Sequence, residues 1–448
     1  LEEFAANRGA IDSLKMLGSM YATGKLGVPV DVVAAFKYYL EAAERGNDAE
    51  AQFFVARFYF SALKLLLTNS VEEAMNDRYD MMAELSRDPT VIKTEDDEYV
   101  YVDPKMQLKM QAAELQRAKI DYSTYPGLSK RTATTKLKES SKLGLYYLEK
   151  AAQNDHTKAQ MLLARFYMDG REMEANLKVA FGLMQRAAEK NDAGAYYNLG
   201  TLYYTGVRAN VLKDKLPEGV SSTCMSPEDK LIYYETFEIP QDVNKAIEYF
   251  KRSAELDDPV ALYWLGYSLI HGQDMEKDVK QGVQLVNRAC QLGHPQAFYY
   301  MYLLYSEGQE VPKNEQFANE MFQAALEANS SDAKYDLADR CLRGTHGERK
   351  DARRAFTLYE EAGKLGNGYA LFCLGSMYYH GIGTGVDYRK AHERYSQAVG
   401  CGVKEAFVPL ARMTIKGEGV DKPDEKYGRY LLELAKEAGV EFDESMLE

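Results

Sequence analysis

Small and apolar residues recur along this chain with a spacing that predicts helices repeated in tandem. Counted from an Ala, a unit carries Leu at position 4, Gly or Ala at position 5 and Tyr or another apolar residue at position 8. These positions fall on one stripe of a helix with 3.6 residues per turn. The clearest copies begin at Ala195, Ala261 and Ala370, and weaker copies begin at Ser13, Ala51, Ala159, Ala297, Ala333 and Ala406. We therefore expect about nine units with a period of about 36 residues.

Each unit is expected to contain a second helix. A glycine that can end the first helix recurs at Gly206, Gly272, Gly308, Gly344, Gly381 and Gly417. A residue that can cap the next helix follows at Asp31, Asp242, Asp278, Asn314, Asp351 and Asp387. A small residue stands four positions after each cap, which predicts close packing of the second helix as well. Units of this kind bury their apolar faces only by stacking on their neighbours, so the pattern predicts an all-α solenoid of helical hairpins.

One stretch of the chain matches a known repeat closely. Residues 370–402, ALFCLGSMYYHGIGTGVDYRKAHERYSQAVGCG, resemble the Sel-one-like repeat (SLR), a relative of the tetratricopeptide repeat with the pattern A-x-x-x-L-G-x-x-Y-x-x-G-x-G-V-x-x-D-x-x-K-A. The copies at Ala51 and Ala333 depart most, since Val55-Ala56 and Leu337-Ala338 replace Leu-Gly. The resemblance implies an α/α right-handed superhelix of about nine SLR/TPR-like hairpins that serves as an adaptor in multiprotein complexes. It implies no shared reaction.

Two insertions interrupt a solenoid that we otherwise expect to span residues 1–448 as a single domain. Residues 63–141 split the second repeat with helical segments and a closing basic segment. That basic segment holds Lys130, Arg131, Lys136, Lys138 and Lys142. We interpret it as a solvated loop, and the alternative is an arm that docks on an acidic or phosphate-bearing partner. Residues 207–240 lengthen the loop between the helices of the fourth repeat, and their apolar run LIYYETF must pack against something.

Aromatic residues recur at position 2 of successive units. They are Tyr197, Tyr263, Tyr299, Tyr335 and Phe372, and Trp264 and Tyr300 stand beside them at position 3. Aligned with tetratricopeptide repeats, positions 2, 3, 6, 9 and 10 line the concave side, so the resemblance implies an aromatic ladder along a groove that binds a peptide or a helix. Tyr and Trp are over-represented at binding hot spots. The alternative is that these rings, among 34 tyrosines in the chain, fill the seams between units.

Position 10 is polar and changes from unit to unit. It is occupied by Thr205, His271, Glu307, Arg343, His380 and Lys416. We include His271, Arg343 and His380 among the candidate partner-binding residues, because a changing charge at a fixed place can select a partner. The alternative is a row of solvated helix ends.

Charge and length limit the partners. The net charge of −13 and a pI near 5.2 argue against affinity for nucleic acid or an anionic membrane. No apolar run approaches the roughly 20 residues that span a bilayer. We therefore expect a soluble chain whose partners are other proteins in a hetero-oligomeric complex.

The cysteines and the first residues bear on the compartment. The five cysteines do not recur at a fixed repeat position, which favours a reducing intracellular setting such as the cytoplasm or the mitochondrion and leaves the endoplasmic reticulum lumen open. Residues 1–12 resemble the end of a second helix, and Leu1 is not Met. We therefore expect that upstream residues are missing and that the compartment cannot be read from this end.

The chain offers little for chemistry. Ser61 and Lys64 form a lone Ser-x-x-Lys motif without the companion motifs of a serine acylating enzyme, and the six histidines lack zinc-ligand spacing. We expect no catalytic residue, metal or cofactor. The first hypothesis is a non-enzymatic adaptor that binds partners through the groove and the insertions. The second is a transient assembly or quality-control factor, and a β-lactamase-type serine hydrolase is a remote third.

Overall fold

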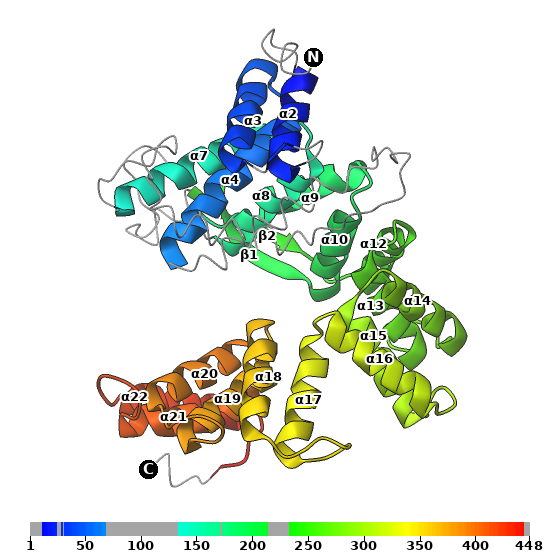
Figure 1. The fold of residues 1–448 in the computed structure, drawn as a ribbon, viewed down its shortest axis with the longest axis vertical. Coiled ribbons are helices and arrows are strands. Elements are labelled where there is room, and N and C mark those ends of the chain that lie inside the picture. The colour runs from blue at the N-terminus through cyan, green and yellow to red at the C-terminus, as the bar shows by residue number, and fades with distance from the viewer. Residues whose placement is uncertain are drawn as a thin grey trace. The chain divides into compact units, whose positions relative to one another are not determined.

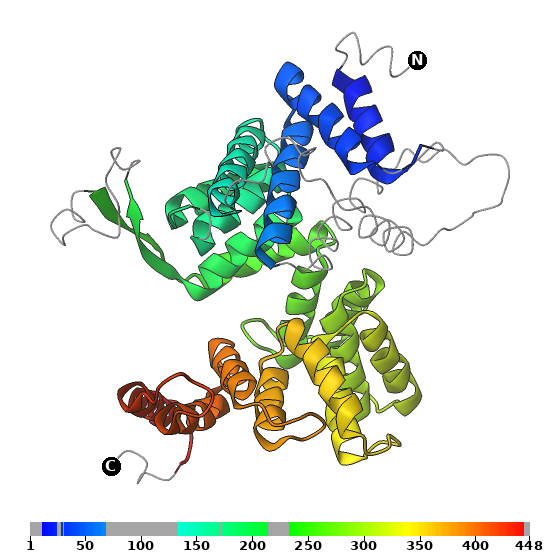
Figure 2. The same cartoon turned by 60° about the vertical axis from the view of Figure 1, so that its left-hand side comes forward.

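The computed structural model describes residues 11–24, 28–29, 31–68, 133–170, 173–213 and 233–442. The chain divides into two compact units, Leu1–Leu256 and Asp257–Glu448, and each is treated by itself. Within the described residues both units are built almost entirely from helices, and consecutive helices pack most closely in pairs (Figures 1 and 2).

The first unit contains four helical hairpins and one pair of strands. The hairpins are α2 (Ile11–Thr23) with α3 (Val32–Gly46), α4 (Ala49–Thr68) with α7 (Ala133–Gln153), α8 (Thr157–Asp169) with α9 (Leu177–Glu189), and α10 (Ala193–Thr205) with α12 (Val243–Glu255). The strands β1 (Val207–Leu212) and β2 (Tyr234–Ile239) lie between α10 and α12 in the chain.

The second unit contains five hairpins. They are α13 (Pro259–His271) with α14 (Val279–Gln291), α15 (Pro295–Glu307) with α16 (Glu315–Glu327), α17 (Ser331–Arg343) with α18 (Ala352–Lys364), α19 (Gly368–His380) with α20 (Tyr388–Gly400), and α21 (Phe407–Lys416), preceded by the single turn η4 (Lys404–Ala406), with α22 (Glu425–Glu437). The described residues thus hold the nine hairpins that the sequence pattern predicts.

The predicted helix ends are confirmed. Each of the six predicted caps accepts a hydrogen bond through its side chain from a backbone N–H two or three residues further on. Five of the six glycines adopt the left-handed conformation directly after a first helix. Gly206 differs, with φ of 63° and ψ of 139°, because β1 begins at the next residue and the chain must leave the helix extended.

Close packing explains the small residues inside the helices. A Cβ added to Gly266 of α13 would lie 2.8 Å from the carbonyl oxygen of Gly282 in α14, and a Cβ on Gly282 would lie 2.7 Å from that of Gly266. At Gly200 and Gly375 the obstacle is a buried ring of the second helix, Phe250 or Tyr395, each 2.7 Å away. The two helices of a hairpin therefore approach to backbone contact where these residues cross.

The second insertion contains strands where the sequence led us to expect only a longer loop. β1 and β2 pair antiparallel, with Val207 opposite Ile239 and Leu212 opposite Tyr234. Val211 and Ile239 are buried, and the Phe237 ring lies 6.0 Å from the ring of Phe181 on α9. The described apolar residues of the strand pair thus pack on the preceding repeat.

Polar contacts hold the strand pair to the same repeat. The Asn176 side chain, which caps α9, donates to the Leu212 carbonyl oxygen at 3.1 Å, and Lys178 pairs with Glu235 at 2.7 Å. Cross-strand pairs of Arg208 with Glu238 and of Asn210 with Thr236 occupy the opposite face. The hairpin therefore has one apolar face toward α9 and one polar face.

The first insertion is narrower than predicted. Helix α4 continues to Thr68, and α7 already begins at Ala133, so the part of the basic segment from residue 133 onward is helix and the loop interpretation is wrong there. Lys130 and Arg131 lie outside the described residues, as do the side chains of Lys136 and Lys138. The docking arm stays a prediction.

Gly266→Ala tests the backbone contact. Because the added methyl group meets backbone atoms of α14 that cannot rotate away, we expect the free energy of unfolding to fall by about 1–3 kcal/mol in a urea titration. Gly400→Ala, in the same unit and with no atom within 4 Å of the new Cβ, should not destabilise the protein. Equal effects of the two substitutions would contradict the packing explanation.

Candidate protein-binding surface

The aromatic residues predicted at position 2 lie on first helices, and each packs against its own hairpin or the next. Tyr197 lies on α10 of the first unit, whereas Tyr263, Tyr299, Tyr335 and Phe372 lie on α13, α15, α17 and α19 of the second unit. All five are half-buried. Four of them contact a buried ring on the second helix of their own hairpin: Tyr197 with Phe250, Tyr299 with Phe322, Tyr335 with Tyr359 and Phe372 with Tyr395, at centroid distances of 5.4–6.5 Å. These side chains thus fill the seam between the two helices of a hairpin and remain partly exposed. Their role in partner binding stays a prediction.

A compact tyrosine cluster joins α13 to α15. The ring centroid of Tyr300 lies 5.9 Å from that of Tyr263 and 5.3 Å from that of Tyr267. The Tyr300 hydroxyl forms a 2.9 Å hydrogen bond with Nε2 of His271. Burial, reinforced by the charges of Tyr267 and Asp332, raises the pKa of Tyr263 to about 12. The Tyr263 hydroxyl is therefore protonated at neutral pH.

Tyr267 is the member that the sequence interpretation missed. Its side chain is 37% exposed, whereas Tyr300 is 8% exposed and Trp264 is half-buried beside the cluster. Tyr267 occupies position 6 of its unit, one of the positions that the tetratricopeptide alignment assigns to the concave side. That assignment was the signal that could have found it.

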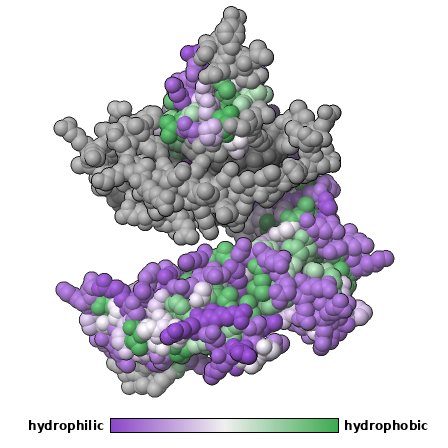
Figure 3. Space-filling view, viewed as in Figure 1, coloured by the Kyte–Doolittle hydropathy of each residue, from purple (hydrophilic) through white to green (hydrophobic). Residues whose placement is uncertain are grey.

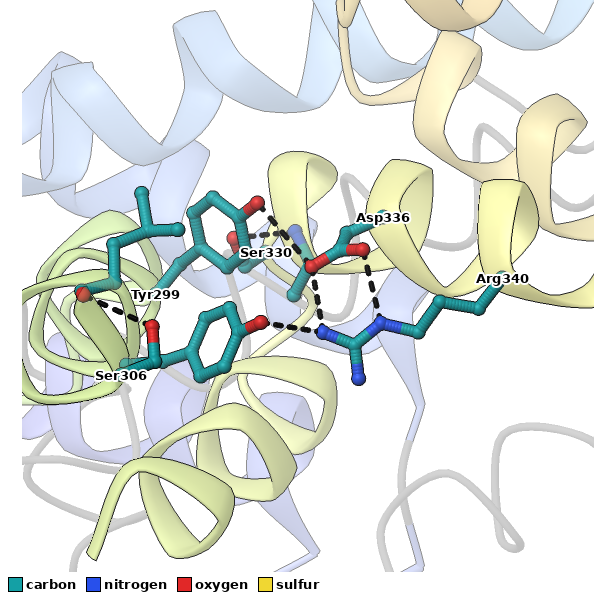
Figure 4. A network of polar contacts seen from close by, with 8 residues as sticks. Tyr299, Ser306, Ser330, Asp336 and Arg340 are labelled. Carbon is teal, nitrogen blue, oxygen red and sulfur yellow. Dashed lines mark hydrogen bonds and ion pairs between the residues drawn. The ribbon is translucent and has the colours of Figure 1, made fainter. Parts of the chain in front are cut away.

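A buried arginine links the next two repeats (Figure 4). Arg340 of α17 donates to the Asp336 carboxylate at 2.8 and 3.0 Å and to the Tyr302 hydroxyl of α15 at 2.7 Å. Its guanidinium carbon lies 4.1 Å from the ring centroid of Phe322 on α16. The Tyr299 hydroxyl reaches Asp336 at 3.5 Å. This network holds Tyr299, a predicted ladder residue, in place.

The position-10 residues lie at exposed helix ends. Besides His271, Arg343 pairs with Asp339 one turn earlier at 2.9 Å, and the His380 ring lies 5.0 Å from that of Tyr379. Figure 3 shows that apolar residues of the second unit form patches between hydrophilic ones on the viewed side. Whether position 10 selects a partner stays a prediction.

Other sites are sparse in the part of the chain that the structure describes. No group of three or more His, Cys, Asp or Glu side chains there is arranged to hold a metal ion. Among the same residues, no helix combines the length and apolar character needed to cross a membrane. The side chains of Ser61 and Lys64 lie outside the described set.

Repeated hairpins with small residues at the crossings and rings in the seams define a helical-repeat protein of the tetratricopeptide-like class. The Sel1 repeat family model matches residues 11–47, 136–156, 157–192, 193–216, 231–258, 259–294, 296–330, 331–367, 368–401 and 410–440. These segments cover more than half of the chain, so the protein belongs to the Sel1 repeat family and the predicted resemblance is confirmed. Sel1 repeat proteins generally mediate protein–protein interactions and are typically non-catalytic scaffolds.

Solved structures with similar folds come from several bacteria. A protective antigen of uropathogenic Escherichia coli strains with an SLR fold, c5321, is 20% identical over 97% of this chain and 78% of its own, with a TM-score of 0.39. A Sel1 repeat protein from Oxalobacter formigenes is 21% identical over 75% of this chain and 87% of its own, with a TM-score of 0.40. The immunity protein Pa5087 from Pseudomonas aeruginosa is 19% identical over 55% and 81%, with a TM-score of 0.35. No curated protein matches the chain.

His294 makes the stability of this surface depend on pH. Its Nδ1 atom accepts from the backbone N–H of Ala297 at 3.2 Å to cap α15, and its ring stacks on Tyr263 at 5.2 Å. Burial lowers the pKa of His294 below the ordinary value of 6.5 against the smaller opposing effect of Asp258. The contribution of neutral His294 to the free energy of unfolding is therefore fully present above pH 6.5. It is lost as the pH falls from that value toward the folded-state pKa, because the unfolded chain binds the proton first.

His294→Asn provides the test. Asn367 caps α19 in the same way and does not titrate, so we expect the substituted protein to keep its cap and to lose less melting temperature between pH 7 and pH 5 than the wild type. An identical pH profile for the two proteins in thermal scans would show that this cap is not the cause.

Asp336→Ala tests the arginine network. The change leaves the guanidinium of Arg340, which is 8% exposed, without its carboxylate, so we expect a loss of about 3 kcal/mol in the free energy of unfolding measured with urea. The double variant Asp336→Ala with Arg340→Met removes the unpaired charge and should recover much of that loss. A double variant that is less stable than the single one would contradict this account.

Proposed function

We propose that this protein is a non-enzymatic adaptor subunit that holds other proteins in a multiprotein complex. The observation that carries the proposal is the row of aromatic side chains on α13, α15, α17 and α19. Rings of this row contact buried rings of the second helices, and Tyr267 and Tyr369 beside them are exposed to solvent. These two tyrosines are 37% and 51% exposed. Aromatic side chains of this kind dominate the binding energy of protein interfaces.

Contacts that fix an aromatic ring before a partner arrives favour binding, because they lower the entropy cost of association. Tyr335 contacts both Tyr359 and Tyr369, at 5.7 and 6.4 Å, so its ring is already fixed before a partner arrives. Burial, with smaller effects from Cys373 and Asp339, raises the pKa of Tyr335 to about 12, so its hydroxyl stays protonated and can donate to a partner at neutral pH. Preorganised amphipathic rings lose little conformational freedom on binding.

The first unit offers a second, separate candidate surface. The strand pair of the second insertion presents Arg208, Asn210, Thr236 and Glu238 on its polar face, away from α9. These side chains offer hydrogen-bonding groups beside the helical repeats of the first unit. We propose that they contribute polar contacts to the same class of partner.

Tyr263→Ala with Tyr299→Ala tests the adaptor function. We expect affinity capture from a native extract, read by mass spectrometry, to recover a fixed set of partners with the wild type and to lose it with the double variant, because the two rings lie on the first two helices of the row. The circular-dichroism spectrum should stay helical.

The matched control is Tyr427→Ala with Tyr430→Ala on α22, where both rings are about half exposed and lie outside the row. This control should retain the partners. Loss of helicity in the Tyr263 and Tyr299 variant would make those residues structural, and substoichiometric, salt-labile recovery by the wild type would favour a transient assembly factor over a fixed subunit.

A further inference from the structure

We propose that the tyrosine cluster of α13 and α15 binds an arginine side chain of a basic segment in a partner protein. We call Tyr263, Tyr267, His271, Tyr300 and Glu307 the arginine-binding patch. The inference rests on the proposed adaptor function and names the chemistry of the partner.

The first argument is an exposed ring face that the chain itself leaves open. The ring centroid of Tyr267 lies 5.3 Å from that of Tyr300 and 4.4 Å from that of His271. Guanidinium and ammonium groups bind tyrosine faces within about 6 Å of the ring centroid. Among the described residues no Lys or Arg lies over Tyr267, although Lys245 lies 4.1 Å from the Tyr203 centroid and Lys150 lies 4.5 Å from that of Tyr146.

The second argument is negative charge at both ends of the cluster without a matching cation. Glu307 is exposed at the end of α15 and takes part in no ion pair with the described residues, whereas its neighbour Glu310 is neutralised by Lys277 at 2.7 Å. At the other end, Asp332 is half-buried and accepts a hydrogen bond from Asn367 at 2.9 Å but meets no Lys or Arg among the described residues. A cation brought by a partner would complement both carboxylates.

The pKa of Tyr300 responds to the carboxylates near the cluster. Burial raises the pKa of Tyr300, and the charges of Glu310 and Glu307 add to that effect. Burial also raises the pKa of Asp332, and the hydrogen bond from Asn367 opposes this effect. The carboxylate of Glu307 thus acts on Tyr300, which places a negative charge beside the cluster.

The third argument is that the next repeat holds an arginine of the chain itself with similar groups. There the guanidinium of Arg340 lies over Phe322, donates to the Tyr302 hydroxyl and pairs with Asp336. Aromatic faces, a tyrosine hydroxyl and a carboxylate therefore surround an arginine supplied by the chain itself. The patch on α13 and α15 presents the same three kinds of group without the arginine.

The test uses a fluorescein-labelled peptide of four Gly-Arg units and the same peptide with citrulline, which keeps the shape and removes the charge. Fluorescence anisotropy with the full chain should show binding of the arginine peptide at least tenfold tighter than that of the citrulline peptide. Trp264, the single tryptophan of the chain and a neighbour of the cluster on α13, should change its emission during the titration.

Two exposed substitutions locate the site without disturbing the core. Tyr267→Ala and Glu307→Gln should each weaken the arginine peptide by at least about threefold. Tyr430→Ala and Glu433→Gln on α22 make the same chemical changes at exposed positions outside the patch and should leave the affinity unchanged. Unaltered affinity in the patch variants, or equal binding of arginine and citrulline peptides by the wild type, would overturn the inference.

The adaptor function and the arginine site fail in different ways. If the wild type captures partners from extract and Tyr267→Ala with Glu307→Gln captures the same set, the adaptor stands and the arginine site is overturned. If the peptide results hold but no partner is captured, the arginine site is supported and the adaptor function fails.

Discussion

The structure depends on the close crossing of two helices at small side chains. The alanines that open the first helices, among them Ala195, Ala261, Ala297 and Ala370, are 0% exposed, and so are Ala246 and Ala355 on the second helices. Where the residue is glycine, as at Gly266 and Gly282, the backbones themselves touch. A larger side chain at either place would force the two helices apart where they cross, because interiors have little room to accept extra atoms.

Large aromatic rings pack against the small residues at which the helices cross. The buried rings of Phe250 and Tyr395 lie directly against Gly200 and Gly375, and Phe322 and Tyr359 are buried rings of other second helices. The half-buried rings of the first helices then rest on them and complete the seam. Stability and a candidate binding surface therefore share side chains, which is why the groove and seam interpretations of the aromatic ladder are not mutually exclusive. Substituting such a residue would therefore change both the free energy of unfolding and the affinity for a partner.

The sequence predicts what repeats and misses what occurs once. Helix caps such as Asp278 and Asp387 and the glycines that end the first helices stand out because their chemistry returns unit after unit and each acts on its own neighbours in the chain. The pairing of β1 with β2 gives no such signal, since its apolar face is defined by Phe181 and other residues of a different repeat. The exposure of Tyr267 and the burial of Arg340 likewise depend on side chains from other helices. They become visible only when the repeats are packed.

Repeat architecture lets a single position change its chemistry without disturbing the packing. The residue that caps a first helix is Asp258, His294, Ser330 or Asn367 in four successive units, and each accepts from the N–H three residues on. The cap geometry is therefore constant, while the charge and the titration of the capping group vary. Position 7 of the first helix changes likewise, since it is Arg340 in one unit and Leu304 in the preceding one. Because each hairpin contacts only its neighbours, such differences stay local, and binding specificity can reside in one pair of repeats while the others maintain the fold.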